Sequence, residues 1–149
     1  MDGPDSPGEL KARALRYLVR REHSRAELAR KLAPRAPSPE ALHALLDELS
    51  AKRQLSDERY AEERARMLAR KFGPAKIRYD LKSKGIAAEL LQRVTAEGEL
   101  ERARAVLARK YRQPVATREE RARRGRFLHA RGFSAEVIAR LIHDTEEAA

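Results

Sequence analysis

The sequence predicts an all-α protein made of three tandem three-helix repeats that form an elongated, curved body. Apolar residues recur at helical spacing along the chain after residue 8, and no stretch alternates convincingly with period two. A short pattern also repeats, because Leu81–Glu89 and Leu128–Glu136 share an apolar residue, a basic residue beside glycine, and a new helix start. With a fainter copy at Leu32, the leading leucines lie 49 and 47 residues apart, a period typical of tandem helical units.

The first repeat is predicted to follow a disordered lead, since residues 1–8 are acidic and rich in turn-forming residues. Ser24 and Glu27 fit a capping box, in which each residue satisfies a backbone N–H of the other. Pro39 follows Ser38 and suits the first position of a helix, where its missing N–H costs nothing. The predicted helices of this repeat, residues 9–53, are 9–22, 24–33 and 38–53.

The second repeat begins where Ser56 precedes two acids, which suit the positive end of a helix dipole. Gly73-Pro74 again places proline at a helix start, and Gly85 follows a basic residue at a position suited to the left-handed conformation that ends a helix. This repeat is predicted to span residues 54–98, with helices at 56–72, 74–84 and 87–97.

The third repeat has matching signals. Thr117 and Glu120 fit a second capping box, and Gly132 takes the place that Gly85 holds in the second repeat. The repeat is predicted to span residues 99–146, with helices at 99–112, 117–131 and 134–146. Linkers are short apart from the proline-punctuated stretches 33–37 and 112–116, so neighbouring repeats are not expected to tumble independently.

The composition predicts an anionic partner. The 149 residues include 33 Lys+Arg and 23 Asp+Glu, a net charge of +10, which attracts polyanions or acidic protein surfaces, although a solvated surface alone has the same composition. The absence of cysteine excludes disulfides and cysteine-ligated zinc. The N-terminal residues are unlike a signal peptide and no apolar run is long enough for a membrane span, so we expect a cytoplasmic protein.

No pattern in the sequence indicates catalysis. The four histidines have no metal-ligand spacing, and the sequence has neither a glycine-rich phosphate loop nor a nucleophile elbow. Paired acids such as Asp57 and Glu58 lie at predicted helix starts, where capping explains them. We therefore expect no enzymatic activity, no metal ion and no cofactor.

Basic residues concentrate on the middle helix of each predicted repeat, and successive copies of that helix could align into one stripe. Tyr79 lies among the basic residues of the second repeat, where we expect it to pack rather than to stack on a base. The candidate partner-binding residues are Arg25, Lys31, Lys76, Arg78, Lys82, Lys84, Arg121, Arg124, Arg126 and Arg131.

The order and spacing of several segments resemble the bacterial RecX family. The resemblance covers about residues 9–146, and the chain departs from the family pattern at the proline-rich loop 33–37 and at residues 124–126. The segments that carry it are 14–18, 24–28, Lys31-Leu32, Leu55–Glu62, Gly73–Ile86 and Gly125–Ser134.

The resemblance implies a small α-helical modulator of the recombinase RecA. Proteins of this family bind RecA and its filaments on DNA and suppress ATP hydrolysis, strand exchange and co-protease action. It follows that the candidate residues would face RecA or the DNA of the filament, and that the protein would act as a monomer. We expect reversal of Lys76, Arg78, Lys82 and Lys84 together to weaken inhibition more than reversal of Arg64, Arg66 and Arg70.

The alternative is a helix-turn-helix-like DNA-binding regulator that does not act on RecA. Three-helix units with a basic helix also describe such proteins, and arginine can read guanine in the major groove. Against this alternative, the basic helix occurs three times, and the sequence contains no asparagine.

Overall fold

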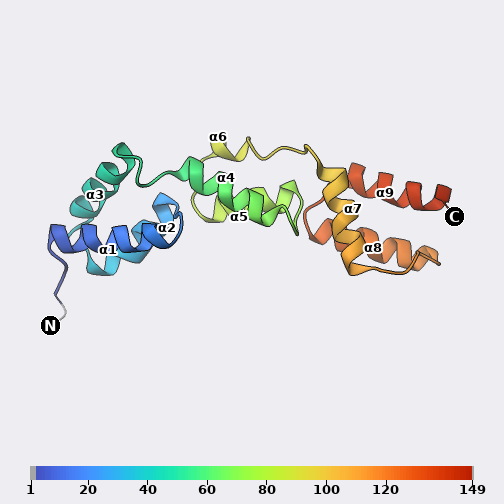
Figure 1. The fold of residues 1–149 in the computed structure, drawn as a ribbon, viewed down its shortest axis with the longest axis horizontal. Helices are drawn as coiled ribbons and strands as arrows, with labels where there is room; N and C mark the ends of the chain where they lie inside the picture. The colour runs from blue at the N-terminus through green and yellow to red at the C-terminus, as the bar shows by residue number, and fades with distance from the viewer. Residues whose placement is uncertain (1–2, 149) are drawn as a thin grey trace. The chain divides into compact units, whose positions relative to one another are not determined.

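The computed structural model describes the backbone of residues 3–148 and the side chains of residues 3–142. No strand occurs within the described residues, so the predicted all-α class is confirmed (Figure 1). The helices are α1 (Pro7–Arg20), α2 (Arg25–Leu32), the 3₁₀ helix η1 (Ala33–Arg35), α3 (Pro39–Ala51), α4 (Asp57–Leu68), α5 (Pro74–Ser83), α6 (Ala88–Leu91), α7 (Glu99–Lys110), α8 (Arg118–Ala130) and α9 (Ala135–Ala148).

The chain divides into two compact units, and the division falls inside α4 and α5. The first unit runs to Arg64 and includes Leu81–Leu91, whereas the second contains Ala65–Asp80 and the chain from Gln92 onward. The predicted repeat boundaries at 53/54 and 98/99 are a different division of the chain and remain predictions.

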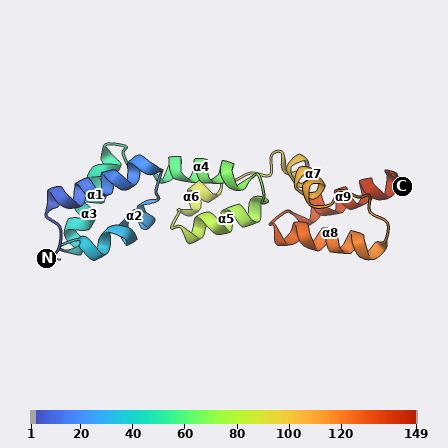
Figure 2. The ribbon, with the colours of Figure 1, turned by 60° about the horizontal axis from the view of Figure 1, so that its bottom comes forward.

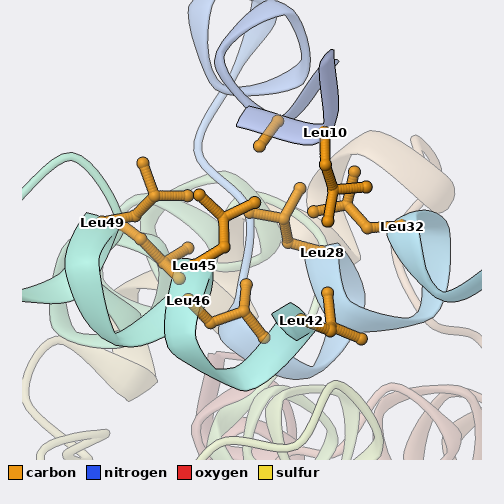
Figure 3. Packing of buried hydrophobic residues seen from close by; sticks show 9 residues of the cluster. Leu10, Leu28, Leu32, Leu42, Leu45, Leu46 and Leu49 are labelled. Carbon is orange, nitrogen blue, oxygen red and sulfur yellow. The ribbon is translucent and has the colours of Figure 1, made fainter. Parts of the chain in front are cut away.

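Helices α1, α2 and α3 lie side by side in the first unit (Figure 2), and a leucine-rich core packs between them. The α3 leucines recur at positions i, i+3, i+4 and i+7, which places them on one face of the helix. That face meets leucines from α1 and α2, and the close view shows their side chains pointing toward one another (Figure 3). The labelled core residues are Leu10, Leu28, Leu32, Leu42, Leu45, Leu46 and Leu49.

Helix α1 begins at Pro7, inside the stretch 1–8 that is predicted to be a disordered lead; Met1 and Asp2 lie outside the described residues. The Ser6 Oγ accepts a hydrogen bond from the Glu9 N–H and the Glu9 carboxylate accepts one from the Ser6 N–H, which is a complete capping box. Asp5 is only 3% exposed and accepts hydrogen bonds from Arg13 Nε at 2.7 Å and Arg35 Nη2 at 3.0 Å. These hydrogen bonds, that from Arg13 above all, lower the pKa of Asp5.

In each of the two capping boxes predicted in the sequence, at Ser24 and at Thr117, only one of the two expected hydrogen bonds forms. Ser24 Oγ accepts from the Glu27 N–H, but the Glu27 carboxylate binds the Arg21 guanidinium rather than the serine backbone. Thr117 Oγ1 accepts from the Glu120 N–H, and the Glu120 carboxylate accepts from the N–H one residue before the cap. The helix starts are as predicted because the hydroxyl half of the motif is sufficient to cap a helix.

The predicted helix 87–97 is wrong in length, since α6 ends at Leu91. Beyond it the chain turns, the Thr95 hydroxyl accepts from the Glu97 N–H, and Gly98 adopts a left-handed φ of 71°. Val94 and Thr95 are β-branched and fit a helix poorly, and a threonine hydroxyl that bonds nearby backbone competes with helical hydrogen bonds. Helix α4 is also shorter than predicted and ends in turns after Leu68.

A second core joins α7, α8 and α9 in the second unit. Ala103, Val106, Leu128, Phe133 and Leu141 are buried together. Nearby, the rings of Tyr111 and Phe127 pack edge to face with centroids 5.8 Å apart. Glu99 is buried as well, and its carboxylate accepts from the Ser134 N–H at 2.7 Å just before α9 begins. A charged side chain from one helix therefore fixes the start of another.

Each unit contains a junction in which one middle helix ends against the start of another. In the first unit, the Ser24 hydroxyl before α2 donates to the Lys84 carbonyl after α5 at 2.8 Å, and Gly85 follows with φ 83°. In the second unit, the Gly73 N–H donates to the Arg131 carbonyl at 2.7 Å, and the Ala75 N–H donates to the Gly132 carbonyl at 3.2 Å. Gly132 has φ 90°, so both glycines take the predicted left-handed conformation.

Candidate partner-binding surface

Helix α5 presents most of its polar residues to solvent. Ile77 and Leu81, four positions apart, are buried on one face. Lys76, Arg78 and Lys82 are exposed on the rest of the helix. Tyr79 is 75% exposed, so the expectation that it packs is wrong. The helix therefore carries an aromatic ring and three cations together on its solvent-facing side.

Two of the α5 cations are held in place by neighbouring backbone. The Lys76 ammonium lies 5.0 Å from the centre of the Phe72 ring and donates to the Ala130 carbonyl at 3.4 Å. Arg78 Nη1 donates to the Val94 carbonyl at 3.0 Å. Carbonyls and rings orient these cations without cancelling their charge, because neither partner is an anion. Lys82 is exposed, and Lys84 is half-buried at the junction with α2.

The predicted arginines of α8 divide into anchored and exposed side chains. Arg124 lies 4.6 Å from the centre of the Tyr111 ring and donates to the Gln113 carbonyl at 2.8 Å. Arg131 lies against the rings of Phe72 and Phe127, at 5.3 and 5.0 Å. Arg121 is half-buried and Arg126 is exposed. Arg124 and Arg131 thus pack the second unit with their apolar faces, while Arg126 is available to a partner.

The middle helix of the first repeat is less cationic than its composition suggests. Arg25 forms an ion pair with Asp47 at 2.8 Å, which neutralises it locally. Lys31 lies 4.8 Å from the centre of the Tyr17 ring, and its ammonium is 2.9 Å from His23 Nε2. The three basic helices that sequence analysis treats as equivalent therefore differ, and α5 and α8 keep more of their charge.

His23 is buried rather than on the surface, with 1% of its area exposed. A lysine ammonium can only donate, so His23 Nε2 accepts from Lys31 and Nδ1 carries the proton that is donated to the Arg21 carbonyl at 3.0 Å. Burial lowers the pKa of His23, and the charges of Arg21 and Lys31 act in the same direction. The imidazole is a neutral structural link between α1 and α2.

A cleft of about 560 Å³ lies in the second unit near the starts of α5, α7 and α9. Arg78 and Arg140 line it, but so do Glu99, Glu101 and Glu136. Because both signs of charge line the walls, the cleft does not favour a polyanion. Within the described residues, no three His, Asp or Glu side chains lie together in a way that could hold a metal ion.

A second opening in the same unit, the arginine groove, has a volume of about 440 Å³. This groove is not among the predicted sites, because its arginines lie outside the middle helices. A signal is present in the spacing: Arg66 and Arg70 are four positions apart with one alanine between them, and Arg102 and Arg109 are seven apart with three. The lining residues are Arg66, Ala69, Arg70, Arg102, Ala105 and Arg109.

The fold and these surfaces define a class: all-α proteins of tandem three-helix repeats with cationic helix faces. Family models match the chain in three consecutive segments. They are described as the first, second and third three-helix domains of RecX, and they match residues 11–49, 56–94 and 97–142. The chain belongs to the RecX family. The prediction of three tandem three-helix repeats and the family resemblance are thereby confirmed.

Relatives of similar length support the assignment. The chain is 48% identical to the regulatory protein RecX of Leptothrix cholodnii over 89% of this chain and 87% of that protein. It is 44% identical to the regulatory protein RecX of Ralstonia nicotianae, over 96% and 92% of the two chains. The crystal structure of RecX from Lactobacillus salivarius has the same fold, with a TM-score of 0.81 at 23% identity over 94% of this chain and 96% of that one.

Proposed function

We propose that this protein regulates the recombinase RecA by binding RecA and its filaments on DNA. In this proposal it inhibits RecA ATP hydrolysis, strand exchange and co-protease activity, and so modulates recombination, DNA repair and the SOS response. The observation that carries the proposal is the match of all three RecX domain models in order along one chain. The relatives named regulatory protein RecX, which align over most of their own length, support a regulatory role without an enzymatic activity.

The exposed side of α5 is the best candidate for the contact with the filament. Lys76, Arg78 and Lys82 are exposed there and bear no ion pair within the described residues. A filament of protein and DNA is a repeating anionic target, and a chain with several weak cationic contacts gains affinity through effective concentration. Inhibition then requires that one state of the filament be bound in preference to another, because equal binding to both shifts nothing.

None of the helices within the described residues is long and apolar enough to cross a membrane. A regulator of RecA filaments acts where the DNA is, so we propose a cytoplasmic location.

The test is the ATPase activity of RecA on single-stranded DNA, measured with increasing amounts of the protein. The wild type is expected to suppress the activity, and Lys76→Glu with Lys82→Glu is expected to weaken the suppression. The matched control is Arg16→Glu with Arg20→Glu, which makes the same change in charge at two exposed positions of α1. Circular dichroism of each variant establishes that the helices are intact.

The outcomes separate the alternatives. Equal losses from the α5 variant and the α1 control would mean that net charge alone drives binding, and the assignment to α5 would be wrong. No suppression by the wild type would contradict the proposed function itself. Selective binding to particular sequences of duplex DNA, without any effect on RecA, would support the helix-turn-helix-like regulator instead.

A further inference from the structure

The arginine groove contains four guanidinium groups and no acid. Arg66 and Arg70 line it from the end of α4 and the turn that follows, and Arg102 and Arg109 line it from α7. The remaining lining residues, Ala69 and Ala105, are small enough for another chain to approach the helix backbones closely. All six residues belong to the second unit, so the groove is a feature of one compact body.

Two arginines of this groove are held by backbone carbonyls, and none of the four is neutralised by an acid within the described residues. Arg102 Nη1 donates to the Glu97 carbonyl at 2.8 Å, and Arg109 Nη2 donates to the Arg70 carbonyl. Arg102 Nε is buried and has no hydrogen-bond partner within the described residues. None of the four takes part in an ion pair within the described part of the chain. In the first unit, by contrast, Arg13, Arg25 and Arg59 each bind a carboxylate.

The chemistry of the groove fits a phosphodiester backbone. Guanidinium groups bind phosphate through paired N–H donors and keep their charge at any physiological pH. Four such charges brought close together without an acid repel one another, and a polyanion relieves that repulsion. The groove contains no aromatic ring for stacking and no asparagine or glutamine that could read a base edge. The groove should therefore bind the sugar–phosphate backbone without preference for a base sequence.

We propose that the arginine groove binds the sugar–phosphate backbone of single-stranded DNA directly. The guanidinium groups come from two segments, the end of α4 with the turn after it and α7, and a flexible single strand can bring successive phosphates to both. This activity goes beyond the proposed regulation of RecA, because it requires no RecA. It also makes Arg66 and Arg70, which sequence analysis places in a set of lesser effect, part of a site of their own.

The test uses the full-length protein and a fluorescently labelled single-stranded oligonucleotide, with binding followed by anisotropy over a salt series and no RecA present. Arg66→Gln with Arg70→Gln changes two exposed arginines and leaves Arg102 and Arg109, which bind backbone carbonyls, in place, so the fold should survive. We expect the variant to bind roughly tenfold more weakly at low salt, and the slope of log affinity against log salt to fall by about 1.4 because two phosphate contacts are lost. Arg66→Lys with Arg70→Lys should keep the slope, since lysine retains the charge.

The control is Arg16→Gln with Arg20→Gln, two exposed arginines at the same spacing on α1. It loses the same charge and should leave the slope unchanged. The proposal would be overturned if the wild type and the groove variant had the same slope. It would also be overturned if the groove variant and the control changed the slope equally. Competition by polyglutamate as strong as that by unlabelled single strands would overturn it too, because it would point to an acidic peptide. Duplex DNA that competes better than single strands would overturn the choice of a single strand.

The result is independent of the proposed function. A groove variant that loses DNA binding and still suppresses RecA would separate two activities of one chain. A wild type that binds DNA without any effect on RecA would leave the groove in place and remove the regulatory proposal.

Discussion

His23 shows how one buried side chain can make the first unit sensitive to pH. Its ring is neutral, donates to the Arg21 carbonyl and accepts from Lys31. Protonation would place a second donor against the Lys31 ammonium, in a site with almost no contact with water. The charged groups around the ring are Arg21 and Lys31, which lower its pKa, and Glu27, which raises it less than burial lowers it.

We predict that His23 reduces the stability of the protein as the pH falls below about 6.5, the usual pKa of histidine in an unfolded chain. The folded pKa is lower, so between the two values the unfolded state binds more protons and stability rises with pH. Thermal melts between pH 8 and pH 5 should show a fall in Tm for the wild type that is smaller in His23→Gln. His129→Gln, at an exposed position, should melt like the wild type over this range. Parallel profiles for all three proteins would contradict the prediction.

At the scale of helices, Ser24 has two roles and Ser38 has one. Both hydroxyls cap a helix by accepting from the N–H three residues on. Ser24 is also fully buried and donates to the Lys84 carbonyl, whereas Ser38 is half-buried and has only the cap. A serine therefore contributes more to the stability of the fold at residue 24 than at residue 38.

We predict that Ser38→Ala lowers the free energy of unfolding by about 1 kcal/mol, the usual effect of losing a cap. Ser24→Ala should lower it by about 2–3 kcal/mol, because the Lys84 carbonyl also loses its buried donor. Chemical denaturation of the two variants in parallel measures the difference. Ser24→Thr keeps the hydroxyl and should recover part of the loss. Equal effects of the two alanine substitutions would mean that the hydrogen bond across the junction contributes nothing.

The junction at Gly132 depends on the absence of a side chain. A Cβ there would lie 2.5 Å from the Lys76 backbone N, and the φ of 90° is one that L-residues rarely adopt. Gly73 faces it across the junction, and a Cβ at that position would lie 2.5 Å from the Gly132 carbonyl oxygen. Neither clash can be relieved by rotating a flexible side chain, because backbone atoms form both contacts.

We predict that Gly132→Ala lowers the free energy of unfolding by about 2–4 kcal/mol, more than the roughly 1 kcal/mol that the left-handed conformation alone costs a residue with a side chain. Gly8→Ala is the matched control, since its Cβ would meet nothing within 4 Å. In helix α1 it should be neutral or stabilise by up to about 1 kcal/mol. A Gly132→Ala variant as stable as the wild type would show that the two backbones can move apart freely.

At the scale of the whole molecule, most of the helices follow from local signals in the sequence. Ser38, Pro39 and Pro74 mark helix starts as predicted, and the helical spacing of the leucines gives the core of α3. The complete capping box at Ser6 was missed because the acids and turn residues around it suggested disorder. Helix α6 is shorter than the predicted 87–97, and Val94 and Thr95 are the residues beyond it that disfavour a helix.

The candidate surface was less predictable than the helices. Sequence alone gives the number of cations on a helix but not what neutralises them. Arg25 is paired with Asp47, which lies 22 positions along the chain, and Arg131 packs on aromatic rings. The sequence predicts that Tyr79 packs, and only its exposed fraction in the structure shows that it does not. The arginine groove combines two segments more than 30 residues apart, a contact that no local pattern contains.

We predict that salt acts on the folding and on the binding of this protein in opposite directions. The net charge of +10, together with arginines that have no acidic partner, makes the folded state repel itself at low salt. Raising sodium chloride from about 50 to about 200 mM should raise Tm while it weakens binding to single-stranded DNA. Differential scanning fluorimetry and anisotropy on one buffer series compare the two. Arg66→Gln with Arg70→Gln should melt higher than the wild type at low salt, and a Tm that falls with added salt would contradict the prediction.

The glycine junctions also have a consequence for how this chain can vary. Every single-base change in a glycine codon that alters its meaning either ends the protein or introduces a residue with a Cβ. At Gly73 and Gly132 that Cβ would clash with backbone atoms, so no single-base change at either codon gives another residue that fits. A mutant gene could recover only through a second, compensating change or by reversion. These codons should therefore accumulate silent changes in their third base while the amino acid stays the same.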